Sequence, residues 1–183
     1  ENKKIFVFVG RLSQQKRPIE ILKLVKSRSK FSDEYFVMLG DGELAPEVDA
    51  FINNNSLCNV KRISYIENVP EFFAVCSGII FTSVFEGLPI AMLEALSMGV
   101  PVLSTDVGDV AIVLEEYGGG FVTKNTYSTE YFYESFETWL THRDDYIMNL
   151  KTHEKEILDY FSSEKIAEQY ADCWRIAINQ YRR

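Results

Sequence analysis

Short apolar runs alternate with segments of helical spacing along the first two thirds of the chain. The apolar runs are rich in β-branched and aromatic residues, which favour strands. They predict strands at 4–9, 35–39, 60–63, 78–82, 100–104 and 121–123. A proline stands near the start of several intervening segments, where the first turn of a helix tolerates it because that N–H has no partner. These prolines are Pro18, Pro46, Pro70 and Pro89.

The alternation predicts a Rossmann-like α/β fold, a parallel β-sheet of about six strands with helices on both faces. From residue 127 the pattern becomes helical only, and helices are expected at 128–142, 144–161 and 163–183. We therefore expect one domain over 1–183, with 1–125 as the sheet core and 126–183 as a helical C-terminal tail. Because the first predicted strand starts at Lys4 almost without a lead-in, we also expect the chain to be one domain of a larger enzyme.

Composition and charge argue against several classes of protein. The 183 residues are 46% hydrophobic and 25% charged, which is typical of a packed globular domain. A net charge of −8 argues against non-specific binding to nucleic acid or to an anionic membrane. No apolar run approaches the ~20 residues that a transmembrane helix needs. We therefore expect no transmembrane segment, no nucleic-acid partner and no signal peptide before the first strand.

Cysteine and histidine placement argues against a metal site. The cysteines are scattered without metal-binding spacing and are typical of a reducing compartment; they are Cys58, Cys76 and Cys173. His142 and His153 lie in polar helical sequence, so neither a metal ion nor a histidine-centred triad is expected. We expect a cytoplasmic protein. Any peripheral binding to the cytoplasmic face of the membrane is expected to come from a domain outside this chain.

Two carboxylates stand out between 78 and 104, a stretch that predicts strand, loop, helix and strand. Glu86 lies in the loop and Glu94 in the middle of the helix. At 3.6 residues per turn, Glu94 shares a face with small residues, whereas the bulky residues lie on another face. A carboxylate on a face of small residues indicates a ligand contact. A solvated helix face is the alternative.

Cations follow the first strand. Arg11 and Lys16 lie at its carboxyl end, where open α/β sheets bind ligands. An arginine fork and a lysine ammonium are typical of diphosphate binding, although two exposed surface charges are the alternative. No G-x-G-x-x-G, Walker motif or aspartate-x-aspartate metal cluster is present. We expect phosphate to be held by cations and helix N–H groups, without a metal or cofactor.

Several of these segments resemble one known family. They are G-R-L-S-Q-Q-K-R-P at 10–18, G-D-G-E-L at 40–44 and F-E-G-L-P-I-A-M-L-E-A-L-S-M-G-V-P-V-L-S-T-D-V-G at 85–108. The chain resembles the C-terminal donor-binding domain of the group-one retaining glycosyltransferases, which include glycogen and sucrose-phosphate synthases and have the two-domain GT-B fold. The resemblance covers about 5–122. Glu86 and Glu94, with seven residues between them, match the E-x7-E motif of this family.

The resemblance implies that a sugar moves from a nucleoside-diphosphate sugar, most often a UDP-sugar, to a glycan or lipid-linked acceptor. Arg11, Lys16 and Glu86 would be the catalytic residues: the cations stabilise the leaving diphosphate and Glu86 approaches the donor sugar. Glu94 would accept hydrogen bonds from the ribose hydroxyls. The remaining donor-binding positions implied are Gly10 in the first loop, Tyr65 and Ile66 near the base, and Gly87, Leu88, Pro89 and Ile90 near sugar or phosphate.

The chain departs from the family pattern at two places. Asp109 and Ile112 stand where the family often has a second glycine and a glutamate, and Arg17 replaces a frequent glycine. Three alternatives stay open: a nucleotide-sugar epimerase of the same architecture, a catalytically silent nucleotide- or phosphate-binding module, and a purely structural domain. The resemblance places the acceptor site in an N-terminal domain that this chain lacks. We therefore expect weak nucleotide binding and little or no sugar transfer by the chain alone.

Overall fold

The structure is a computed structural model that describes residues 3–31, 33–124 and 128–181. Its described residues form one parallel sheet of six strands in the order β3-β2-β1-β4-β5-β6, which confirms the predicted fold class. The strands are β1 (Lys4–Val9), β2 (Glu34–Leu39), β3 (Val60–Ile63), β4 (Gly78–Phe81), β5 (Val102–Thr105) and β6 (Gly120–Thr123). The fifth strand begins two residues later than predicted. Pro101 has no N–H to donate, although its carbonyl still accepts from Ile79 N at 3.0 Å.

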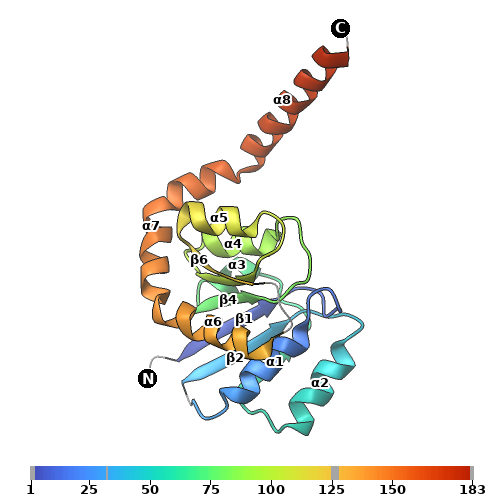
Figure 1. The fold of residues 1–183 in the computed structure, drawn as a ribbon, viewed down its shortest axis with the longest axis vertical. Coiled ribbons are helices and arrows are strands. Elements are labelled where there is room, and N and C mark those ends of the chain that lie inside the picture. The colour runs from blue at the N-terminus through green and yellow to red at the C-terminus, as the bar shows by residue number, and fades with distance from the viewer. Residues whose placement is uncertain (1–2, 32, 125–127, 182–183) are drawn as a thin grey trace.

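Helices cover both faces of the sheet (Figure 1). One layer contains α1 (Pro18–Ser27), α2 (Ala45–Asn54) and α6 (Thr129–Thr141). The other contains α3 (Val69–Phe73), α4 (Ile90–Ser97), α5 (Val110–Tyr117) and α7 (Arg143–Tyr160). Successive residues of β1 enter opposite cores: Phe6 and Phe8 pack beneath α1 and α6, while Val7 packs beneath α4 and α5. Burial on both faces explains why the strands are continuously apolar.

A buried ion pair ties α1 to the sheet. The Arg28 guanidinium, directly after α1, donates two hydrogen bonds to the Glu34 carboxylate at the start of β2 and another to Glu137 on α6. Arg28 is 5% exposed and Glu34 is 2% exposed. Burial alone would lower the pKa of Arg28, but hydrogen bonds to the carboxylates outweigh it and raise that pKa. The guanidinium therefore stays charged, and it holds a carboxylate that water does not reach.

The strand order reverses between β1 and β4, and open α/β sheets have a crevice at such a point, outside the carboxyl ends of the strands. β1 and β4 are neighbours, yet α1 and α4, which follow them, lie on opposite faces. The chain therefore continues toward opposite faces of the sheet from the carboxyl ends of these two strands. Such a switch point is where open α/β sheets bind ligands. It carries most of the residues that the sequence predicts for the site.

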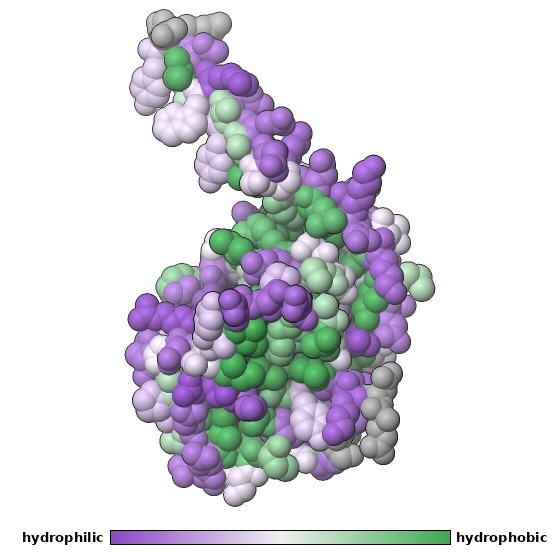
Figure 2. Space-filling model, turned by 180° about the vertical axis from the view of Figure 1, so that it is seen from behind, coloured by the Kyte–Doolittle hydropathy of each residue, from purple (hydrophilic) through white to green (hydrophobic). Residues whose placement is uncertain are grey.

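The last helix, α8 (Ser163–Tyr181), extends away from the domain (Figure 1). None of its described residues is buried. Its apolar residues, which include Tyr170, Trp174 and Ile178, follow helical spacing, and Figure 2 shows paler and greener side chains along one side of the projecting helix. Across the described residues, every helix is too short or too polar to span a bilayer. The predicted helical tail is confirmed, whereas the prediction of a further domain stays a prediction.

Candidate functional site

The β1–α1 and β4–α4 loops are joined by hydrogen bonds at the switch point. The buried Thr82 hydroxyl, at the end of β4, contacts the backbone carbonyls of Lys16 at 2.7 Å and Arg17 at 3.1 Å. The backbone N–H of Val84 donates to the carbonyl of Gln15 at 2.8 Å. A hydroxyl and an amide from one loop thus fix three successive carbonyls of the other. The loops form one unit before any ligand arrives.

Side chains of the first loop reach back to the second. The Gln15 amide donates to the carbonyl of Phe85 at 2.8 Å, and the Arg17 guanidinium donates to the carbonyls of Thr82 at 2.5 Å and Ser83 at 3.4 Å. Arg17 has φ of 49°, in the left-handed region where glycine is favoured. The arginine that replaces the family glycine therefore adopts a strained backbone and uses its side chain to bind the neighbouring loop.

Lys16 and Glu86 form an ion pair in the crevice. The Lys16 ammonium donates to Glu86 Oε1, and the Ser83 hydroxyl donates to the same oxygen at 2.7 Å. The Lys16 side chain is 19% exposed and that of Glu86 12% exposed. The structure therefore brings together two of the three predicted catalytic residues. Each of the two side chains is the other's counter-ion.

Two glycines allow the loops to pack this closely. Gly40 has φ of 145°, and a Cβ there would lie 2.0 Å from the carbonyl oxygen of Gly10. Gly108 has φ of 51°, and a Cβ there would lie 2.0 Å from the carbonyl oxygen of Gly87. Asp109 N donates to that same carbonyl at 3.1 Å. The β5–α5 loop, where the sequence departs from the family pattern, thus supports the backbone beside Glu86.

Arg11 lies apart from the Lys16–Glu86 pair. Its side chain is exposed and forms an ion pair with Glu43 at 3.3 Å, in the loop after β2. An exposed pair of this kind contributes little to stability. Arg11 therefore stands at the rim of the crevice, where exchanging Glu43 for an anionic ligand costs little.

Glu94 points from α4 without a partner. Its residue is half-buried, and within the described ranges its carboxylate has neither a hydrogen bond nor an ion pair. The same helix begins at Ile90. Pro89, predicted to lie in its first turn, directly precedes it in an extended conformation with φ −65° and ψ 121°. No side chain among the described residues caps this N-terminus. The first amides of α4 are thus available to a ligand.

The remaining predicted donor-binding residues lie around the same edge of the sheet. Gly10 ends β1, and Lys16 Cε would lie 3.6 Å from a Cβ placed on it. Tyr65 is 75% exposed and Ile66 is half-buried, both in the loop after β3. Gly87 is exposed and Leu88 half-buried at the entrance to α4. Their contacts with a donor stay a prediction.

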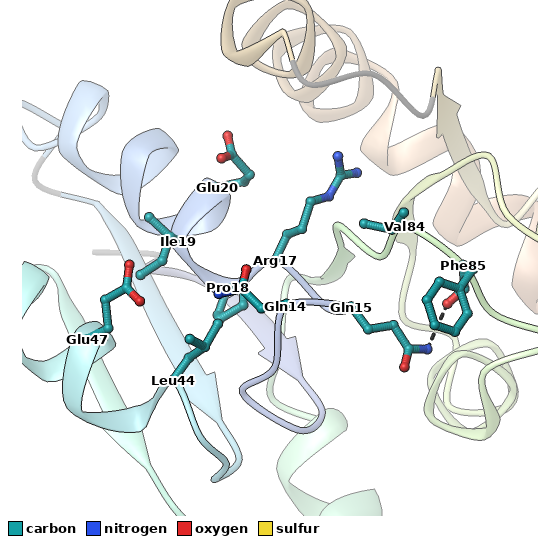
Figure 3. A pocket seen from close by; sticks show the side chains of 10 residues that line it. All are labelled: Gln14, Gln15, Arg17, Pro18, Ile19, Glu20, Leu44, Glu47, Val84 and Phe85. Carbon is teal, nitrogen blue, oxygen red and sulfur yellow. Dashed lines mark hydrogen bonds between the residues drawn. The ribbon is translucent and has the colours of Figure 1, made fainter.

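A cavity of about 640 Å³ lies on the α1 and α2 side of the joined loops (Figure 3). Its lining includes Gln15 and Phe85, the residues that directly precede Lys16 and Glu86. The predicted catalytic residues do not line it. Sequence reasoning missed Thr82, Gln15 and Phe85, because each acts through a contact with a residue that is 65 to 70 positions away in the chain. The sequence signal for Gln15 and Phe85 was their position next to Lys16 and Glu86, and that for Thr82 was its position directly after β4.

Comparison with known proteins identifies the family. The family described as "Glycosyl transferases group 1" matches residues 1–156. The chain belongs to the group 1 glycosyltransferases. This confirms the resemblance carried by the E-x7-E segment. Among the described residues, no cluster of histidine, cysteine, aspartate and glutamate is placed to hold a metal ion.

Named relatives agree with this assignment. An Escherichia coli UDP-Gal:alpha-D-GlcNAc-diphosphoundecaprenol alpha-1,3-galactosyltransferase is 27% identical over 94% of this chain and 46% of its own length. A Campylobacter jejuni alpha-1,4-N-acetyl-D-galactosaminyltransferase, named for an undecaprenol-linked acceptor, is 30% identical over 52% of the chain and 27% of its own length. This chain therefore spans about half or less of these relatives. They give no support to the epimerase alternative.

Solved structures show the same fold. Anabaena Alr3699/HepE in complex with UDP matches 95% of this chain and 49% of its own, with a TM-score of 0.81 and 18% identity. Sucrose-phosphate synthase from Thermosynechococcus elongatus matches 98% of this chain and 46% of its own, with a TM-score of 0.78 and 16% identity. At such identities the likeness establishes the fold only. The GT-B type of architecture expected from the sequence is thereby supported.

Proposed function

We propose that this chain is the nucleotide-sugar-binding domain of a retaining glycosyltransferase. The complete enzyme would transfer a sugar from a nucleoside-diphosphate sugar, with UDP as the preferred nucleotide, to a glycan or lipid-linked acceptor. The observation that carries the proposal is the Lys16–Glu86 pair at the switch point. On α4, which follows the same loop, Glu94 has no partner among the described residues, and no described side chain caps the start of the helix. The UDP in the HepE complex and the UDP-Gal in the name of the E. coli relative support the choice of nucleotide.

The cations supply the chemistry that the leaving group needs. When the bond between sugar and diphosphate breaks, negative charge develops on the diphosphate. Lys16 and Arg11, together with the first amides of α4, would stabilise that charge in the transition state. Before substrate binds, Lys16 is neutralised by Glu86. A diphosphate carries more negative charge than one carboxylate, so it competes for the ammonium and draws Lys16 from Glu86.

Glu86 would then be free to approach the sugar. Its second hydrogen bond, from Ser83 at 2.7 Å, keeps the carboxylate at the crevice when Lys16 turns toward the diphosphate. There the carboxylate can accept a hydrogen bond from a donor-sugar hydroxyl. Glu94 would accept hydrogen bonds from the ribose hydroxyls, each a charge-assisted bond of about 1.5–3 kcal/mol. The base would lie near the backbone of Tyr65 and Ile66.

A thermal-shift panel of nucleoside diphosphates tests the proposal, because a ligand that binds the folded state raises the unfolding temperature. We expect UDP to stabilise the chain and the Glu94→Ala variant to lose most of that stabilisation. Glu94 has no side-chain partner in the described structure, so this variant should fold normally. No stabilisation by any nucleotide at millimolar concentration, or equal stabilisation of the variant, would remove the basis of the proposal.

Turnover separates an enzyme from a silent binding module. We expect little transfer by this chain alone, since it spans about half the length of its relatives and the acceptor would need the rest of the protein. Product analysis with UDP-sugars and the full-length protein should show transfer with retention of the anomeric configuration. Nucleotide binding with no product from any donor would favour the silent module.

A further inference from the structure

The cavity beside the joined loops has a lining that the donor-site residues do not explain. It measures about 640 Å³, within the ~300–1,000 Å³ typical of small-molecule sites. Figure 3 shows Gln15 and Phe85 at one end and Leu44 and Glu47 at the other, with Pro18 of α1 between them. Walls therefore come from the first loop, the start of α1, the start of α2 and the β4–α4 loop.

The polar groups of this cavity favour a neutral ligand with hydroxyls. Glu47 is exposed, and inside the described ranges its carboxylate has no hydrogen bond or ion pair. Glu20 is the second carboxylate in the lining, and it pairs with Lys23 at 2.7 Å. The Arg17 guanidinium already donates to main-chain carbonyls. Two carboxylates beside an engaged cation repel phosphate, whereas carboxylate and amide oxygens accept hydrogen bonds from hydroxyls.

The apolar part of the lining offers a platform for a ring. Phe85 is 63% exposed, although it stands in a loop that is otherwise held by hydrogen bonds. Ile19, Leu44 and Val84 add aliphatic surface to the same cavity. A pyranose has C–H groups on its faces and hydroxyls around its rim. The exposed Phe85 ring lies at the same end of the cavity as the Gln15 amide, and carboxylate oxygens of Glu20 and Glu47 stand elsewhere in the lining, so the cavity offers a partner for both features.

We propose that this cavity holds a neutral sugar unit of the acceptor. The inference rests on the proposed function and adds to it a binding site on this domain for the acceptor. Phe85 directly precedes Glu86 and Gln15 directly precedes Lys16, and the two are joined at 2.8 Å. A sugar in the cavity therefore lies against the far side of the wall that carries the proposed donor site, and the rest of the acceptor can reach over its rim to the donor sugar.

An amide-resolved NMR titration of the chain over residues 1–183 tests this inference. The probes are methyl glycosides of neutral hexoses and N-acetylhexosamines in one series and UDP in another. We expect a glycoside to shift the amides of Gln14, Gln15, Glu47 and Phe85, and UDP to shift those of Lys16 and Glu94 without shifting that of Glu47. Phe85→Ala should weaken glycoside binding by roughly twofold to tenfold. Glu47→Gln should weaken it as well, and Tyr170→Ala, a control on the exposed α8, should not.

The outcomes distinguish this inference from the proposed function. UDP binding without any glycoside shift in the cavity overturns the acceptor site and leaves the donor site in place. Glycoside binding that Phe85→Ala does not weaken also overturns it. If UDP shifts the cavity residues and competes with glycosides, the cavity belongs to the donor and the inference is wrong. Loss of UDP binding altogether contradicts the proposed function itself.

Discussion

Replacing Lys16 by methionine removes one ammonium and keeps a side chain of similar length. In the proposed mechanism this ammonium leaves Glu86 and donates to the diphosphate. A charge-assisted hydrogen bond contributes about 1.5–3 kcal/mol, which corresponds to a change of roughly 10–100-fold in the dissociation constant. We therefore expect K16M to bind UDP roughly 10–100-fold more weakly than the unchanged chain.

The same substitution should affect folding, because Glu86 loses its counter-ion. The Glu86 side chain is only 12% exposed. Among the described residues, the Ser83 hydroxyl is then the one group that still donates a hydrogen bond to its carboxylate. An under-satisfied carboxylate in such a place costs about 1–3 kcal/mol of unfolding free energy. The double variant K16M/E86Q removes both charges. It should recover most of that stability without recovering the affinity for UDP, which separates the structural role of Lys16 from its role in binding.

Isothermal titration with UDP at fixed ionic strength measures the affinity, and chemical denaturation measures the stability. Lys4→Met is the matched control. Lys4 stands at the amino end of β1, the strand that leads into the loop of Lys16, and it forms an ion pair with Asp33 at 3.4 Å. It should bind UDP normally. If K16M binds UDP as tightly as the unchanged chain, Lys16 serves only to hold Glu86 and the diphosphate assignment is refuted.

Three further predictions concern the scaffold. Arg28→Met should lower the unfolding free energy by about 3–5 kcal/mol, because it leaves the buried Glu34 without its cation. The double variant R28M/E34M should lose less unfolding free energy than R28M. An unfolding free energy of R28M within about 1 kcal/mol of that of the unchanged chain would contradict this. Deleting residues 163–183 should change the unfolding free energy of the domain by less than about 1 kcal/mol, since no described residue of α8 is buried. Unfolding of the domain after this deletion would contradict the prediction. Burial raises the pKa of the Cys76 thiol to about 12, so at about pH 8 this thiol stays protonated and should resist alkylation while the exposed Cys58 reacts. Mass spectrometry of labelled peptides checks this, and equal labelling of both cysteines would count against it.

The sequence was sufficient to predict the fold because the central strands β1 and β4 are buried on both faces and the segments between strands have helical spacing. Residues such as Phe6 and Val7 enter opposite cores, which leaves β1 apolar from Ile5 to Val9. Helix and strand ends were less predictable. Pro89 precedes α4 instead of starting it, and the sequence does not reveal whether a proline occupies the last extended position or the first helical one.

The contacts within the site were less predictable than its members. Lys16 and Glu86 are 70 positions apart, and they meet because β1 lies beside β4, a strand order that no local pattern encodes. For the same reason the sequence does not show that Arg11 stands at the rim while Lys16 lies inside the crevice. The cavity beside Phe85 forms where separate loops and helix ends converge, so its shape also depends on the assembled fold.

A crystal structure of the chain with UDP tests the central claim most directly. The account predicts the diphosphate between Arg11, Lys16 and the first amides of α4, the Lys16–Glu86 contact broken, and Glu94 accepting hydrogen bonds from the ribose. A diphosphate bound elsewhere on the domain, with Lys16 and Glu86 still paired, would contradict it.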